Sequence, residues 1–499
     1  MRYVSTRGHD TALRASQAIV KGIADDGGLF VPAIMPSTGI SPCELVGFNY
    51  NAHALWLLHR FLTNYSNAEL VNCIDGAYNS RTFSAPDIAP ITMVDNVAFL
   101  ELFHGKTLAF KDIALSILPR LMTMALRKAG NEKTQVILTA TSGDTGVSAL
   151  EGFKDVPGTK IIVFYPENGV SVIQKRHMTT MTGSNVHVFG VKGNFDDAQS
   201  EVKRLFLNNE LKEKIAADGF EFSSANSINI GRLIPQMVYY FHAYSQLIRG
   251  GMTSGDAVNF IVPTGNFGNI LAGYYAKKMG LPIDKLICAS NSNKVLFDYF
   301  DTGVFDSSRP FNITSSPSMD ILVPSNFERL VYDLCRHDLK GRLEKLSAKE
   351  QFQMDVPKDF VGFFATEAEV RDAIKHVFTE HKYLIDPHTA VAYIAYEKFR
   401  GANGRDAGMG AKGNEGKNII ISTASPYKFA KTVMTSLDSS YEKYDDFDLL
   451  EKMAEVTKGH VPPQFEGLRT RQVIHKQAIG VNEMESAVLK VLGTTPATE

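Results

Sequence analysis

The sequence has little of the features that mark several other classes of protein. Its four cysteines, in 499 residues, are scattered singly, and no pair has the spacing of metal ligands. So few thiols are typical of a reducing compartment rather than of a disulfide-rich secreted chain. No apolar run approaches the length of a membrane span, and residues 1–7 lack the apolar core of a signal peptide. We therefore expect a cytoplasmic protein with no metal site and no membrane contact.

The sequence also has no large excess of positive or negative charge. The formal net charge is -2, which gives no general attraction to nucleic acid or to an anionic membrane. Apolar residues make up 44% of the chain and charged residues 21%, as in ordinary globular proteins. The length suggests about three domains and favours an enzyme.

The chain divides into a mainly helical part and an alternating part. Apolar residues recur at helical spacing around residues 11–24, 52–62 and 67–77, so we expect residues 1–95 to form a mainly helical N-terminal domain. After residue 96, short β-branched strands alternate with helices, which favours α/β domains built on parallel sheets. The predicted strands are 98–103, 136–139, 160–165, 186–191, 220–222, 259–262, 286–289 and 418–422.

The alternating part is assigned to two α/β domains. The assignment is 96–134 and 226–435 for a large domain, 135–225 for a small one, and 436–499 for a helical segment packing on the large domain. A glycine-rich surface loop is predicted at 401–417. Pro119 lies inside the helix that begins near Lys111 and should bend that helix near Leu115 or limit its length.

Lys111 is the residue around which the rest is organised. It stands at the predicted start of a helix, directly after the apolar run Leu108, Ala109 and Phe110. Desolvation and the positive end of a helix both lower a lysine pKa, and a neutral amine is the nucleophile of Schiff-base chemistry. The alternative is a helix-start lysine that extends to solvent.

A glycine-rich loop between a strand and a helix is the strongest candidate for phosphate binding. It consists of Gly265, Asn266, Phe267, Gly268 and Asn269, and exposed backbone N–H groups at such a turn can cradle one phosphate monoester. A side chain at either glycine would force that phosphate outward. The alternative is an ordinary turn between strand and helix.

Three other stretches can carry polar contacts to a ligand. A second strand–turn–helix loop, residues 139–146, offers hydroxyl and N–H groups for a carboxylate. Asp144 would repel an anion there, so it caps the helix or accepts from an ammonium or amide. Thr423 follows a buried strand and could offer a hydroxyl. Asn226 precedes a helix that carries Arg232, which could bind an anion or form a structural salt bridge.

Together these stretches resemble the threonine synthases, pyridoxal-phosphate enzymes of fold type II, in their longer bacterial and fungal branch. Residues 104–112 match the Schiff-base segment, 265–269 the cofactor-phosphate loop, and 141–146 the loop at the substrate carboxylate. Further matches are residues 3–8, 26–32, 316–321, 325–329 and 386–390, whereas residues 425–429 depart from a motif that is frequent in the family. The resemblance runs from residue 3 to about 430. It implies two α/β domains of fold type II, similar to tryptophan synthase β, beside the N-terminal helical domain.

The resemblance also implies an activity, the conversion of O-phospho-L-homoserine and water to L-threonine and phosphate with pyridoxal 5'-phosphate as cofactor. Lys111 would be catalytic and cofactor-binding, with Gly265–Asn269 and Thr423 also holding the cofactor. Candidate substrate-binding residues are Lys106, Thr141, Ser142, Gly143, Asp144, Thr145, Asn226 and Arg232. Lys106 stands where the family often has proline, and a solvated loop lysine is an equal alternative.

Two other functions stay open at this point. One is a related phospho-lyase that takes the same substrate to 2-oxobutyrate, and the other is a non-catalytic binding protein of the same fold. The small-molecule substrate leaves no role for nucleic acid or membrane, and we expect a monomer or a weak dimer.

Overall fold

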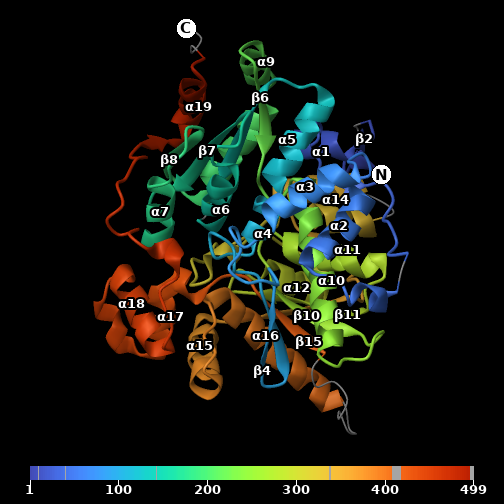
Figure 1. Ribbon diagram of the computed structural model, residues 1–499, viewed down its shortest axis with the longest axis vertical. Helices are drawn as coiled ribbons and strands as arrows, with labels where there is room; N and C mark the ends of the chain where they lie inside the picture. Colours follow the sequence, from blue (N-terminus) through green and yellow to red (C-terminus); the bar gives the residue numbers. More distant parts are fainter. Residues whose placement is uncertain (9–10, 40, 142, 336–338, 407–416, 495–499) are drawn as a thin grey trace.

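The structure is a computed structural model that describes residues 1–8, 11–39, 41–141, 143–335, 339–406 and 417–494. Figure 1 shows one sheet around β6 (Thr134–Ala140), β7 (Thr159–Pro166) and β8 (Val186–Lys192) in the upper part of the view. A second sheet, around β10 (Val258–Pro263), β11 (Ile283–Ser290) and β15 (Asn418–Ser422), lies below it. The N-terminal helices lie on one side of both, coloured blue.

The N-terminal region contains the three helices that the apolar spacing predicts. Two of them begin at polar caps, because the Asn49 side chain accepts from the Ala52 N–H and the Ser66 side chain from the Glu69 N–H. A small antiparallel sheet in the order β2-β1-β3 accompanies them. The elements are β1 (Arg2–Ser5), β2 (Leu13–Arg14), α1 (Ala15–Lys21), β3 (Phe30–Pro32), the 3-10 helix η1 (Pro42–Leu45), α2 (Tyr50–Phe61) and α3 (Asn67–Ala77).

The larger sheet has six strands within the described residues, in the order β14-β11-β10-β15-β5-β4. Each neighbouring pair is parallel except β4 with β5, which is antiparallel. The strands are β4 (Ile91–Val94), β5 (Val97–Glu101), β10 (Val258–Pro263), β11 (Ile283–Ser290), β14 (Phe360–Phe364) and β15 (Asn418–Ser422). β4 and β14 were not predicted from the sequence.

Both faces of this sheet are buried. Along β15, Ile419 and Ile421 join the apolar cluster that contains α10 and α11, whereas Ile420 joins the cluster of α15, α16 and α17. The sequence therefore shows an apolar run rather than alternation, as in other parallel sheets. The helices are α10 (Ile230–Arg249), α11 (Gly268–Met279), α12 (Val295–Thr302), α13 (Phe327–Leu334), α14 (Leu339–Ala348), α15 (Glu367–His381), α16 (Pro387–Asp406) and α17 (Ala430–Leu437). Short elements are β12 (Val304–Phe305), η2 (Pro317–Met319), β13 (Phe352–Gln353) and η3 (Pro426–Phe429).

Two of the local expectations have clear outcomes. The helix that starts at Lys111 ends at Leu115 as α4 (Lys111–Leu115), and α5 (Leu118–Ala129) follows with Pro119 in its first turn. The limited helix length expected from Pro119 is therefore confirmed. The loop predicted at 401–417 does not include residues 401–406, because α16 continues to Asp406; residues 407–416 lie outside the described part.

The smaller sheet has five strands in the described chain, all parallel, in the order β16-β8-β7-β6-β9. Four of them, with their helices, come from the region predicted for the small domain. The elements are β6 (Thr134–Ala140), α6 (Asp144–Phe153), β7 (Thr159–Pro166), α7 (Val172–Thr179), β8 (Val186–Lys192), α8 (Phe195–Leu207), α9 (Asn209–Ala217) and β9 (Phe220–Ser224).

The sequence predicts that the C-terminal segment packs on the large domain, but in the structure it packs on both domains. Its first helices pack on the large domain, but β16 adds a parallel strand to β8, and α19 packs in the apolar cluster of the small sheet (Figure 1). A three-residue strand is too short to be recognised before its partner edge is known. The elements are η4 (Ser439–Lys443), α18 (Asp446–Thr457), η5 (Pro463–Phe465), β16 (Ala478–Gly480), η6 (Val481–Glu483) and α19 (Met484–Leu492). The limits of the other domains stay a prediction.

Two further properties concern the described ranges only. None of their helices combines the length and the apolar character that crossing a membrane requires. Nor do their His, Cys, Asp and Glu side chains form a group of three or more that could hold a metal ion.

Two buried histidines join the N-terminal region to the large domain. His53 on α2 and His242 on α10 have their Nδ1 atoms 3.4 Å apart, and His53 Nε2 lies 3.0 Å from Ser245 Oγ. Burial lowers the pKa of His53 to about 4 and, with the neighbouring His53, that of His242 to about 3. Both rings are therefore neutral in the folded protein at pH 7.

We expect this pair to make the fold sensitive to acid. The unfolded histidines titrate near pH 6.5, so stability is complete above that value and is lost as the pH falls towards 4. Each ring contributes up to about 1.4 kcal/mol per pH unit in this window. Urea unfolding at pH 7 and pH 5 should show a steeper loss in the wild type than in a His53→Gln/His242→Phe variant. Equal losses in the two proteins would contradict the assignment, since other buried histidines respond alike in both.

Candidate active site

Lys111 is held at the start of α4 by a second chain segment that runs beside it. The Phe110 N–H donates to the Thr423 carbonyl at 2.8 Å, and the Ser425 N–H donates to the Leu108 carbonyl at 3.0 Å. Leu108 itself has a left-handed backbone with φ +58°, which turns the chain into the helix. The segment that follows β15 therefore fixes the position of the lysine, although about 310 residues separate the two segments.

The surroundings of Lys111 lower its pKa. The side chain is buried, and its Nζ lies 3.5 Å from Asp144 Oδ2 and 3.3 Å from Ser318 Oγ. Burial lowers the pKa of Lys111, and the nearby Arg232 and Lys428 cations lower it further, against the opposing effect of Asp144. The lowered pKa expected from the sequence is confirmed, and its main cause is burial.

Asp144 is the counter-ion of this cluster. It begins α6, and its Oδ1 accepts from Gln174 Nε2 at 2.9 Å and lies 3.1 Å from Lys428 Nζ. Burial would raise the pKa of Asp144, but the Lys428 and Lys111 ammonium groups outweigh it and hold the pKa far below its usual range. Of the two roles that the sequence allowed for Asp144, the structure shows the acceptor of ammonium and amide groups.

The glycine loop leads into α11 as expected, with its helix beginning at Gly268. Phe267 precedes the helix in the left-handed region at φ +62°, which turns the chain from the loop into the helix. Asn269 Oδ1 accepts from the Tyr239 and Tyr240 hydroxyls at 2.6 and 2.9 Å. These bonds fix the orientation of the amide and leave its Nδ2 without a partner among the described residues.

One cavity of about 530 Å³ brings the predicted residues together. Three buried polar atoms on its wall have no hydrogen-bond partner in the described protein: Asn226 Oδ1, Arg232 Nε and Asn269 Nδ2. Buried polar groups are normally paired, so these atoms indicate the place of a polar ligand. The predicted residues that line this cavity are Lys111, Thr141, Thr145, Asn226, Arg232, Gly265, Asn266, Phe267, Gly268, Asn269 and Thr423.

The loop after β6 is shaped by its own residues. Thr141 Oγ1 accepts from the Gly143 and Gly146 N–H groups at 2.9 and 2.8 Å. Gly143 has φ +130°, and an added Cβ would overlap the Gln174 side chain, so this position requires glycine. Ser142 lies outside the described residues.

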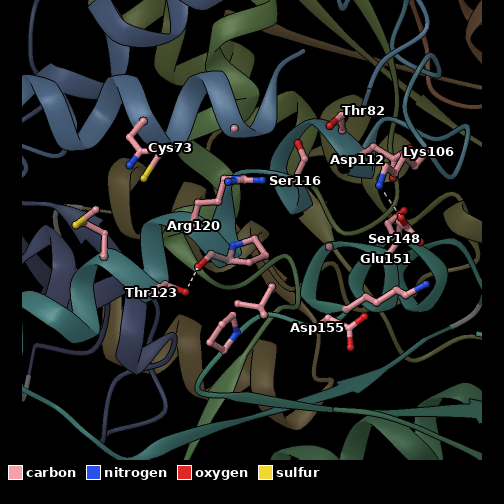
Figure 2. Close-up of a pocket in the computed structure, with 18 of the residues that line it drawn as sticks. Cys73, Thr82, Lys106, Asp112, Ser116, Arg120, Thr123, Ser148, Glu151 and Asp155 are labelled. Carbon is pink, nitrogen blue, oxygen red and sulfur yellow. Dashed lines mark hydrogen bonds and ion pairs between the residues drawn. The ribbon is translucent and has the colours of Figure 1, made fainter. Parts of the chain in front are cut away.

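Lys106 is not part of this cavity. Its Nζ pairs with Glu151 at 2.9 Å on the wall of a separate cavity of about 470 Å³, between α3, α5 and α6. Figure 2 shows this second cavity, with Lys106 and Glu151 beside Asp112 and Ser148. Lys106 is half-exposed and shares no wall with Lys111, so the geometry does not support a contact with the substrate phosphate.

Three residues near Lys111 were missed as functional candidates. Ser318 donates to Asp144 Oδ2 at 3.3 Å, its N–H donates to His388 Nε2, and Lys428 contacts Asp144 from the opposite side. Ser318 and His388 lie in stretches that match the family, and Lys428 lies in a stretch that departs from a frequent family motif. No chemistry was assigned to them, because only the folded chain brings them to Lys111.

Comparisons with known proteins agree with this geometry. Residues 75–408 match the family described as pyridoxal-phosphate dependent enzymes, and residues 2–78 match the threonine synthase N terminus. A threonine synthase of Pseudomonas aeruginosa is 37% identical over 445 residues, which are 87% of this chain and 90% of that protein.

The chain belongs to the threonine synthase family.

Solved structures support the same conclusion. The structure of pyridoxal-phosphate-bound threonine synthase from Brucella melitensis has a TM-score of 0.83 and 33% identity, over 100% of both chains. The threonine synthase from yeast has a TM-score of 0.84 and 31% identity, over 99% of both chains. The family resemblance, the fold class and the pyridoxal-phosphate cofactor predicted from the sequence are thereby confirmed.

The residues present fit this cofactor. An amine of lowered pKa, a glycine loop at a helix start and a partnerless amide donor all face one cavity of suitable size. At Gly268 an added Cβ would meet only the Asn326 Nδ2 within 3.3 Å, so the wall is open there for the close approach of a phosphate.

Proposed function

We propose that this enzyme converts O-phospho-L-homoserine and water to L-threonine and phosphate. The observation that carries the proposal is the convergence of a buried lysine amine with partnerless polar groups on one cavity wall. Its likeness to threonine synthases over nearly the whole chain supports the same substrate.

Lys111 would hold the cofactor covalently as the Schiff-base lysine, and Gly265–Asn269 would bind its phosphate through backbone N–H groups. Thr423, whose backbone already fixes the start of α4, would offer its hydroxyl to the pyridine ring. The bound cofactor supplies the electron sink for chemistry at the substrate carbon atoms, and the protein supplies orientation and charge.

The substrate brings two anionic groups, a carboxylate and a phosphate, which need cationic or N–H partners. Arg232 is buried, its Nη1 donates to the Ala225 carbonyl at 2.9 Å, and its Nε is left to donate elsewhere. Burial lowers the pKa of Arg232 to about 10, so it remains a cation at neutral pH. We assign it to one of these anions, with Asn226 and the loop residues Thr141, Gly143 and Thr145 around the other.

Lys111 would also move protons. Once displaced by the substrate amine, its side chain stays beside the reacting carbon atoms and can take the Cα proton. It can then shuttle protons at Cβ, which loses one and takes up the hydroxyl of water, and at Cγ, which gains one as phosphate leaves. Burial lowers the pKa of Lys111, which favours the unprotonated amine that a general base requires. Asp144 then carries the negative charge that balances the protonated amine.

Product analysis tests this function directly. We expect purified protein with pyridoxal phosphate to turn O-phospho-L-homoserine into equal amounts of L-threonine and phosphate, detected by chromatography and a phosphate assay. Formation of 2-oxobutyrate instead would identify a phospho-lyase, and no product at all would favour a binding protein. Either outcome would overturn the proposal. The cytoplasmic location and the monomer or weak dimer stay predictions.

A further inference from the structure

Lys428 is a buried ammonium group that the reaction described above does not use. Its side chain is 1% exposed, and its Nζ donates to the Thr107 carbonyl at 2.6 Å and lies 3.1 Å from Asp144 Oδ1. Burying an unpaired ammonium costs several kcal/mol, so a lysine in this place needs both partners. It therefore connects η3 of the large domain to the first residue of α6.

Asp144 is shared between two lysines on its two oxygens. Oδ1 faces Lys428 and Gln174, whereas Oδ2 faces Lys111 at 3.5 Å and Ser318. Of the two lysines, Lys428 is the closer. If Lys428 were absent, Lys111 would be the nearest ammonium to a buried carboxylate, and its charged form would be strongly favoured.

No other charged group around Lys111 in the described structure replaces Lys428 as the partner of Asp144. Arg232 on α10 is a further cation that cannot neutralise itself at neutral pH and does not contact Asp144 in the described structure. On α16, His388 Nε2 accepts from the Ser318 N–H, so its proton is on Nδ1 and is donated to Asp386 at 2.8 Å. Asp112, next to Lys111 in the chain, instead accepts hydrogen bonds from the Thr107 N–H and hydroxyl.

We propose that Lys428 is a positioning residue that serves as the permanent counter-ion of Asp144 and thereby keeps the Lys111 amine free to react. This role rests on the proposed function, because it supplies the neutral amine that cofactor attachment and proton transfer both require. Lys428 also donates a hydrogen bond to the Thr107 carbonyl, where the turn that leads to Lys111 begins. One ammonium group thus fixes the orientation of Asp144 and limits its attraction for the proton on Lys111.

The test measures the titration of Lys111 itself rather than turnover. Full-length protein, freed of cofactor with hydroxylamine and checked by near-ultraviolet circular dichroism, is labelled with acetic anhydride between pH 6 and 10. Mass spectrometry then gives the labelled fraction of Lys111 at each pH. For Lys428→Met we expect the titration midpoint to rise by about one pH unit or more, which is about a tenfold loss of reactive amine at pH 7.5.

Two further variants separate this role from a purely structural one. Lys428→Arg keeps the charge and should restore a midpoint near that of the wild type. Asp144→Asn removes the shared carboxylate and leaves the cations, so the midpoint of Lys111 should fall below that of the wild type. This second measurement decides the matter if Lys428→Met fails to fold.

An unchanged midpoint in Lys428→Met, or a midpoint in Asp144→Asn that does not fall, would overturn the proposal. Neither result depends on which product the enzyme makes. A shifted midpoint in a protein that forms no threonine would instead reject the proposed function and leave the role of Lys428 standing.

Discussion

Replacing Lys111 with alanine should reduce turnover by about a thousandfold or more, because the variant loses both the nucleophile and the general base. Borohydride should bleach the colour of the wild-type protein and leave a reduced cofactor attached to Lys111, detectable by peptide mass spectrometry. The variant should still bind the cofactor weakly and reversibly through Gly265–Asn269, so its colour should be lost on gel filtration.

Lys106→Ala is the matched control for this experiment. Lys106 lies five residues before Lys111 and is half-exposed, and its ion pair with Glu151 is of the surface type that contributes about 0–1 kcal/mol. This variant should keep its colour and most of its activity. A borohydride label on another lysine, or a Lys111→Ala variant with substantial turnover, would contradict the central assignment.

A methyl group at Gly268 should weaken cofactor binding at least tenfold while leaving the fold nearly as stable as before. The atom closest to the added Cβ would be Asn326 Nδ2 at 3.3 Å, at the end of its side chain, but the Cβ would project where the cofactor phosphate must approach the backbone. A tenfold change in Kd corresponds to about 1.4 kcal/mol. Absorbance titration with pyridoxal phosphate gives Kd, and urea unfolding of the cofactor-free protein gives stability.

Gly265→Ala provides the contrast. There an added Cβ would overlap the backbone carbonyl of Ser318, so the loop itself must move. Overpacking of this kind costs about 1–3 kcal/mol, and we expect both stability and cofactor affinity to fall. An unchanged Kd in Gly268→Ala would show that the phosphate binds elsewhere.

Much of this protein follows from local patterns in its sequence. The helices α2 and α3, the break before Pro119 and most strands of both sheets follow from apolar periodicity and turn residues, which act over a few neighbouring positions. The lysine segment and the glycine loop were recognised in the same way, because the chemistry of each is contained in one short stretch.

Tertiary structure alone decided what those stretches meet. Lys428 lies in a segment whose sequence says nothing of Asp144, yet the two side chains are 3.1 Å apart. From the sequence, Lys106 could either bind the substrate phosphate or be a solvated loop lysine, but the turn before α4 directs it to Glu151 and another cavity. β16 joins the small sheet only because the edge of β8 is free to accept it. Charge pairing and strand pairing depend on distance in space, and the distance along the chain does not determine it.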